Sequence, residues 1–183
     1  MRRLVAVALL AVAASPRVQA QERYLVLATT RTSTMQQELN DASDRGFRVV
    51  GASRTDGAEV LVVLERASGD FDYHLIATQR TGTLQREITA AAERGYRVVP
   101  QAVTTKRNAG LFGLADANDR SEGELLVIME KGPGTPPGLA YHVVATSRTS
   151  TFQKEMSEAV ERGYTLVALT SRGEHVAIFE RGR

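Results

Sequence analysis

The fold is decided by the stretch YLVLATTRTSTMQQELNDASDRGFRVV (Tyr24–Val50), which returns twice further along the chain. The other two copies are YHLIATQRTGTLQREITAAAERGYRVV (Tyr73–Val99) and YHVVATSRTSTFQKEMSEAVERGYTLV (Tyr141–Val167). The three copies align without gaps, and 12 of the 27 positions are identical in all of them. Self-similarity of this kind indicates an array of one structural unit.

Each copy predicts a strand followed by a helix. The opening apolar run, Tyr24–Ala28 in the first copy, has the length and composition of a strand. Apolar residues then recur at helical spacing, as at Met35, Leu39 and Ala42. We expect N-caps at Ser33, Gly82 and Ser150. Three residues later a glutamine is expected to reach back to each cap amide, at Gln36, Gln85 and Gln153.

The end of each copy predicts two further strands. A glycine follows Arg45, Arg94 and Arg162, and glycine favours the left-handed conformation that ends a helix. A second strand starts after the glycine, and a third ends in an acid and a base (Val60–Arg66, Leu125–Lys131, Val176–Arg181). We expect nine strands and three helices in an α+β fold of three tandem βαββ repeats. Each is a small sheet with one covering helix, and the repeats pack pseudo-symmetrically because one unit alone leaves apolar surface exposed.

The composition divides the chain into a leader, three repeats and two connections. The expected parts are a signal peptide (1–20), repeat 1 (21–69), repeat 2 (70–131) with an inserted loop (104–123), a Gly/Pro linker (132–138) and repeat 3 (139–183). The inserted loop carries Leu111, Phe112 and Leu114. These residues predict either a partner-binding knob or a loop that folds back over the end of a sheet.

The first 20 residues have the features of a secretory signal: two arginines, the apolar run Leu4–Ala14 and small residues before the expected cleavage after Ala20. The run is too short to span a bilayer, so we expect a periplasmic or secreted protein with no membrane span after cleavage. Cleavage removes three arginines and no acid, which changes the formal charge from +2 to about −1. This balance argues against nucleic acid as a partner. The absence of cysteine excludes disulfides and thiolate chemistry.

The strongest polar pattern is Ala-Thr-x-Arg-Thr-x-Thr between the first strand and the helix. Helix amides, an arginine and hydroxyls together favour an anion. The candidate anion-binding residues are Arg31, Thr32, Thr34, Arg80, Thr81, Thr83, Arg148, Thr149 and Thr151. The alternative is structural: the hydroxyls cap the helix and the arginines pair with acids such as Glu65, Glu130 and Glu180.

The sequence predicts no catalytic residues, no metal site and no cofactor. His74 and His142 occupy a strand position that holds Leu25 in the first copy, which favours a packing role, and His175 lies near a turn. No metalloprotease helix, nucleophile elbow or phosphate-binding loop is present in the sequence.

The tyrosine before two apolar residues, the helix with Leu39-Asn40, the Arg-Gly-aromatic step and the closing apolar strand resemble a small bacterial βαββ domain of unknown function. The resemblance implies this fold in three tandem copies and no established catalytic role. We therefore expect an exported non-catalytic binding or scaffold protein whose partner is an unknown protein or a small anionic ligand. The alternative is an enzyme or sensor that binds an anionic small molecule at the Thr/Arg turns.

Overall fold

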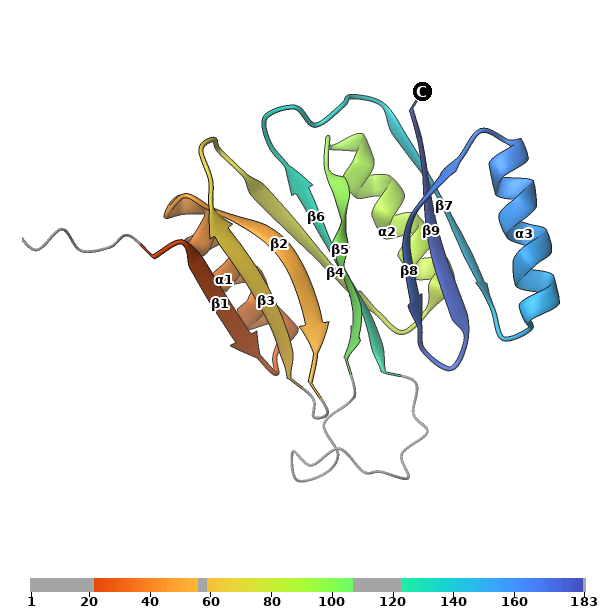
Figure 1. The fold of residues 1–183 in the computed structure, drawn as a ribbon, viewed down its shortest axis with the longest axis horizontal. Helices are drawn as coiled ribbons and strands as arrows, with labels where there is room; N and C mark the ends of the chain where they lie inside the picture. The colour runs from red at the N-terminus through yellow and green to blue at the C-terminus, as the bar shows by residue number, and fades with distance from the viewer. Residues whose placement is uncertain (1–21, 56–58, 107–122, 183) are drawn as a thin grey trace, which may run out of the picture.

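The computed structural model describes residues 22–55, 59–106 and 123–182, which form three successive units (Figure 1). Unit 1 contains β1 (Tyr24–Thr29), α1 (Thr32–Asp44), β2 (Phe47–Arg54) and β3 (Val60–Arg66). Unit 2 contains β4 (Asp72–Thr78), α2 (Thr81–Glu93), β5 (Arg97–Lys106) and β6 (Glu124–Lys131). Unit 3 contains β7 (Leu139–Thr146), α3 (Thr149–Glu161), β8 (Thr165–Ser171) and β9 (His175–Gly182). The described residues thus confirm the α+β fold of three βαββ repeats.

The helix N-caps predicted at Ser33, Gly82 and Ser150 are wrong, because each cap lies two residues earlier, at Arg31, Arg80 and Arg148. These arginines have extended backbones, and no side chain caps the helix amides. The Thr29 hydroxyl oxygen instead accepts the backbone N–H of Arg31 (3.1 Å), and the same contact recurs from Arg80 to Thr78 and from Arg148 to Thr146. This local turn holds the arginine extended, so the helix starts immediately after it.

The helix ends agree with the prediction. The last helical residues are Asp44, Glu93 and Glu161, each followed by the expected arginine. The next residues, Gly46, Gly95 and Gly163, have φ of +78°, +90° and +82°. Glycine is required there because other residues pay a steric cost in this region.

Each unit forms a three-stranded antiparallel sheet with its last strand in the middle. The strand orders are β1-β3-β2, β4-β6-β5 and β7-β9-β8. In unit 1, Tyr24 pairs with Glu65 at one end of the sheet and Thr29 with Val60 at the other. The two outer strands run parallel to each other, and the helix makes the crossover between them.

The three units stack in a row in which α1 and α2 each pack on two sheets, whereas α3 packs on its own sheet alone (Figure 1). Helix α1 packs on its own sheet and on β4, and α2 packs on its own sheet and on β7. Met35 and Leu39 of α1 therefore share one core with Leu126 and Ile128 of β6. On the opposite side of the row, β2 packs against β5 and β5 against β8. The repeats thus have continuous cores across their junctions.

Strand β6 is buried on both faces because of this stacking. Leu125, Val127 and Met129 belong to the core beneath α2, whereas Leu126 and Ile128 belong to the core beneath α1. In β3 the residues that face α1 are buried, and the alternate residues Leu61 and Val63 are only partly buried. Unit 1 therefore has one sheet face that no other unit among the described residues covers.

Several predicted features fall outside the described residues. The signal peptide lies there, and so do Leu111, Phe112 and Leu114 of the inserted loop. Of the segment predicted as an inserted loop, Thr104–Lys106 continue β5. No helix in the described ranges combines the length and the hydropathy needed to cross a membrane.

Candidate functional site: turns and unit junctions

The three strand-to-helix turns occupy equivalent places in the three units. Arg31, Arg80 and Arg148 are exposed caps of their helices. The units follow one another in a row (Figure 1), so the three turns are parts of three separate units.

Two of the three turns carry a carboxylate from the following unit. The Thr32 hydroxyl donates to Glu124 Oε2 (3.3 Å), and the Thr81 hydroxyl donates to Glu174 Oε1 (2.8 Å). Thr149, at the same position in unit 3, is exposed. Of the remaining candidate threonines, Thr83 accepts a bond from Arg86 of its own helix (3.4 Å). A carboxylate next to the helix start repels a small anion, so these contacts oppose anion binding in units 1 and 2.

The predicted pairing of the turn arginines with Glu65, Glu130 and Glu180 is wrong. Among the described residues, none of the three arginines forms an ion pair with these acids. The register gives the reason: Glu65 lies opposite Tyr24 at the start of β1, whereas Arg31 follows the end of that strand. The length of the strand, about 3.3 Å for each residue, separates the two charges.

Glu130 instead forms a polar cluster at the junction of units 1 and 2, in which Glu130 and Tyr73 are buried and the Arg48 side chain is half exposed. Arg48 of β2 donates to both carboxylate oxygens, with an Nη2–Oε1 distance of 2.8 Å and an Nε–Oε2 distance of 3.0 Å. The buried Tyr73 hydroxyl donates to Glu130 Oε2 (2.9 Å) and accepts the backbone N–H of Val49 (2.9 Å). The cluster thus joins β2 of unit 1 to β4 and β6 of unit 2.

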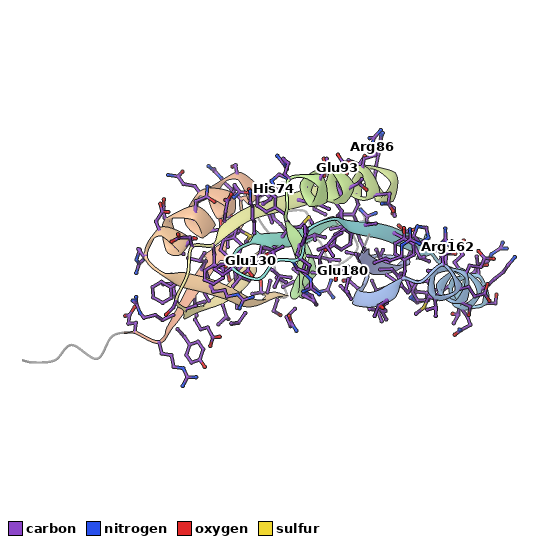
Figure 2. The ribbon with its side chains drawn as sticks, turned by 90° about the horizontal axis from the view of Figure 1, so that it is seen from above. His74, Arg86, Glu93, Glu130, Arg162 and Glu180 are labelled. Atoms are coloured by element: carbon purple, nitrogen blue, oxygen red, sulfur yellow. The ribbon has the colours of Figure 1, made fainter. Side chains whose placement is uncertain are left out.

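The same cluster recurs at the junction of units 2 and 3. Arg97 donates to both oxygens of Glu180 (2.8 and 3.0 Å), and the Tyr141 hydroxyl donates to the same carboxylate (2.7 Å). Tyr141 accepts the N–H of Val98 (3.1 Å). Figure 2 shows Glu130 and Glu180 at successive positions along the row. Because the cluster recurs at both junctions, we identify it as a contact that joins neighbouring units.

Electrostatics keeps the tyrosine and arginine side chains of both clusters protonated at neutral pH. Burial raises the pKa of Tyr73 and of Tyr141 far above the usual tyrosine range, so both hydroxyls remain protonated donors. The hydrogen bonds from Arg48 to Glu130 and from Arg97 to Glu180 raise the pKa of each guanidinium. A phenol with such a high pKa does not serve as a base at neutral pH.

A glutamine bridge is the second repeated contact between units. Gln36 of α1 donates through Nε2 to Tyr73 O (2.9 Å), and its Oε1 accepts Leu75 N–H (2.8 Å). Gln85 makes the equivalent bonds to Tyr141 O (3.0 Å) and Val143 N–H (2.7 Å). The prediction that these glutamines reach back to their own helix caps is wrong. They satisfy the open edge of the next sheet, where the carbonyl and the amide that they reach lie two residues apart.

A polar hollow of about 500 Å³ opens beside the first junction. Its lining includes Arg48 and Arg97, together with Glu65 and Glu130. Two positive and two negative side chains balance in this hollow, and Arg48 is already bound to Glu130. The hollow therefore has no net charge that would select an anion.

His74 and His142 lie on the sheet faces next to an aromatic ring of their own unit. Their rings stand 5.7 Å from Tyr96 and 5.8 Å from Tyr164. Burial lowers the pKa of both histidines, and Arg94 and Arg162 lower it further. Both imidazoles are therefore neutral at pH 7, in agreement with the packing role expected from Leu25 in the first copy.

The sequence contained a signal for the junctions that local reasoning missed. The tyrosine that opens each copy and the glutamine in each helix are identical in all three copies. Each binds backbone atoms of a neighbouring unit, as Tyr73 accepts the amide of Val49 and Gln36 binds Tyr73, and only the packing of units reveals these contacts. No group of three or more potential metal ligands occurs among the described residues.

Comparison with protein-family models, with curated proteins and with solved structures finds no significant match to this chain. The resemblance to the bacterial βαββ domain therefore rests on the residues of this chain alone.

Proposed function

We propose that this chain is an exported, non-catalytic scaffold or binding protein built as a row of three βαββ units. One observation carries the proposal: the tyrosine, glutamate and arginine side chains that recur at both junctions bind each other and hold the units together. A repeat whose polar residues serve stacking is typical of proteins that present extended surfaces.

The alternative, an enzyme or sensor for a small anion at the Thr/Arg turns, receives less support. Glu124 and Glu174 stand beside the first two turns, where they would repel the ligand. The turn of unit 3 has the exposed Arg148 and Thr149. An anion would therefore be expected at unit 3 first.

Thermal unfolding of the chain beginning at Gln21 tests both proposals. Phosphate, sulfate, nucleotides, sugar acids and divalent cations are added separately at millimolar concentration. The scaffold proposal predicts no saturable rise in Tm, because only a ligand that binds the native state raises it. A saturable rise with one anion that Arg148→Ala abolishes, and that the matched change Arg86→Ala preserves, would establish the alternative.

Export belongs to the same proposal. Its support is the leader described above, with cleavage expected after Ala20. Intact-mass measurement of the protein recovered from outside the cytoplasm should give a chain that starts at Gln21. A mass that retains residues 1–20 would contradict export by cleavage.

A further inference from the structure

We propose that copies of this chain associate head to tail, with the open sheet face of unit 1 in one copy bound to the α3 side of unit 3 in the next. This inference deepens the proposed scaffold function by naming its partner as a second copy. The two surfaces are called here the front face and the rear face. The front face consists of the outward residues of β1 and β3, and the rear face consists of α3 and β8.

The exposed large apolar side chains of the described residues all lie on these two faces. Tyr24 and Val26 of the front face are 51% and 57% exposed. On the rear face, Val160, Leu166 and Leu169 are 59%, 40% and 61% exposed. At the inner junctions the positions equivalent to Tyr24 and Leu166 are covered: Tyr73 and Tyr141 in place of Tyr24, and Val49 and Val98 in place of Leu166, are buried.

The two partners of a glutamine bridge lie on opposite faces: the glutamine on the rear face and its backbone partners on the front face. Gln36 and Gln85 bind the next sheet at a tyrosine carbonyl and at an amide two residues later. Gln153 is the same residue of α3; it is exposed, and its Nε2 contacts Ser157 of its own helix (3.4 Å). The equivalent carbonyl and amide on the front face belong to Tyr24 and Val26, on the outer edge of β1.

The threonine–glutamate contact is the second junction contact whose partners lie on opposite end faces. Thr32 and Thr81 donate to Glu124 and Glu174, the residues that precede β6 and β9 or lie at their start. On the end faces the corresponding pair is Thr149 of α3 and Glu59, which directly precedes β3. A third contact joins a tyrosine hydroxyl to a backbone amide.

That third contact would join Tyr24 of one copy to the amide of Leu166 in the next. Tyr73 accepts the amide of Val49, and Tyr141 accepts that of Val98. Leu166 occupies the position of these two valines in β8. The donors and acceptors of three junction contacts are thus present on opposite ends of the molecule.

The rear face also has an apolar hollow, and the equivalent space at each inner junction is filled by side chains. The hollow measures about 510 Å³, and Phe152, Leu169 and His175 contribute to its lining. Met35 and Leu84, which correspond to Phe152, are buried in cores that residues of the following unit complete. In a second copy, Leu61 and Val63 on the outward side of β3 are equivalent to the residues of the following unit that complete these cores inside the chain.

One junction contact cannot recur between copies. Thr165 stands where units 1 and 2 have Arg48 and Arg97, so Glu65 of the next copy would find no arginine. The contact between copies is therefore weaker than the inner junctions, which in addition form within one chain. Association should depend on concentration. Because the two faces differ and lie at opposite ends of the row, it should produce open chains of copies or a ring rather than a symmetric pair.

Sedimentation velocity of the untagged chain beginning at Gln21, from about 1 μM to 1 mM, tests the proposal. The weight-average mass should rise with concentration. Val26→Lys blocks the front face and Leu169→Lys blocks the rear face, and each variant alone should remain a monomer. Arg86→Ala is the matched control, since Arg86 points away from the row on α2 (Figure 2) and should leave association unchanged.

A mixture of the two blocked variants gives the decisive measurement. Each retains the face that the other has lost, so the mixture should form one-to-one dimers and nothing larger. A mixture that stays monomeric while the unmodified chain associates would overturn head-to-tail binding. An unmodified chain whose association Leu169→Lys leaves intact would overturn it as well, because the rear face would then have no role.

A gain of affinity provides the second test. Thr165→Arg restores the missing arginine, so it should lower the concentration of half-association roughly five- to tenfold. Adding Glu65→Gln should abolish that gain. If the unmodified chain and Thr165→Arg are both monomeric at 1 mM, the proposal is wrong, and a scaffold with a different partner remains. A saturable anion effect on Tm in the monomeric Leu169→Lys variant would instead contradict the scaffold function itself.

Discussion

Removal of one hydroxyl from each repeated tyrosine measures what the junction cluster contributes to stability. Tyr73 and Tyr141 make the same two bonds, whereas the equivalent Tyr24 is 51% exposed on a face that no other described unit covers. Tyr→Phe keeps the ring and removes only the oxygen. The three variants therefore form one comparison with its control built into the chain.

The expected loss follows from the groups left behind. In Tyr73→Phe the amide of the buried Val49 loses its acceptor, and an unsatisfied buried donor costs about 1–3 kcal/mol. Glu130 loses one donor but keeps its bonds from Arg48, so its contribution is smaller. We expect a decrease of about 2 kcal/mol in the free energy of unfolding for Tyr73→Phe and for Tyr141→Phe. For Tyr24→Phe we expect less than about 0.5 kcal/mol.

Urea unfolding followed by far-UV circular dichroism measures these differences. Protein is kept at about 1 μM so that association between copies does not affect Tyr24. A loss for Tyr24→Phe as large as for Tyr73→Phe would show that the hydroxyl acts within its own unit, and the junction argument would fail. Losses below about 0.5 kcal/mol in all three variants would equally refute it.

Three further predictions concern single positions. Gln85→Ala should destabilise the chain by about 1–2 kcal/mol because two hydrogen bonds to the edge of β7 are lost. Gln153→Ala in the monomer should change the free energy of unfolding very little, and urea unfolding compares the two variants. Gly82→Ala should raise stability by about 0.5 kcal/mol, since Gly82 is helical with open space around it, and Gly95→Ala should cost about 1 kcal/mol because φ is +90°. The lowered pKa of His142 means that the unfolded chain binds a proton first as the pH falls below about 6.5, so stability decreases from there down to the lowered pKa. Replacement of His142 by leucine, the residue that unit 1 carries, should reduce the fall in Tm between pH 7 and pH 5, and an unchanged slope would contradict this assignment.

Local patterns predicted the elements of the fold well. The spacing of Met35, Leu39 and Ala42 specified the helix, and all three residues are buried on its core side. The glycine after each helix specified where the chain turns, because its conformation is required by the backbone alone. These features depend on residues close in sequence, and the repeat supplied each of them three times.

The contacts between units could not be derived in this way. Thr32 and Gln36 resemble ordinary residues of a helix start, and their bonds to Glu124 and Tyr73 depend on how one unit stacks on the next. The arginines at the turns were assigned to the wrong acids for the same reason. The sequence contains the acid and its true partner, Arg48, but the two lie in different sheets, and only the stacking of unit 1 on unit 2 brings them together.

Strand β6, which is covered on both faces, makes the centre of the row the last part to open. Its residues Leu125 to Glu130 are all buried, and opening them requires separation from both α1 and α2. β1 and α3 lie at the ends of the row (Figure 1) and can fray while the middle stays closed. Amide hydrogen exchange should therefore be slowest in β6 and faster toward both ends, so that the chain opens in steps from its ends inward rather than as one body.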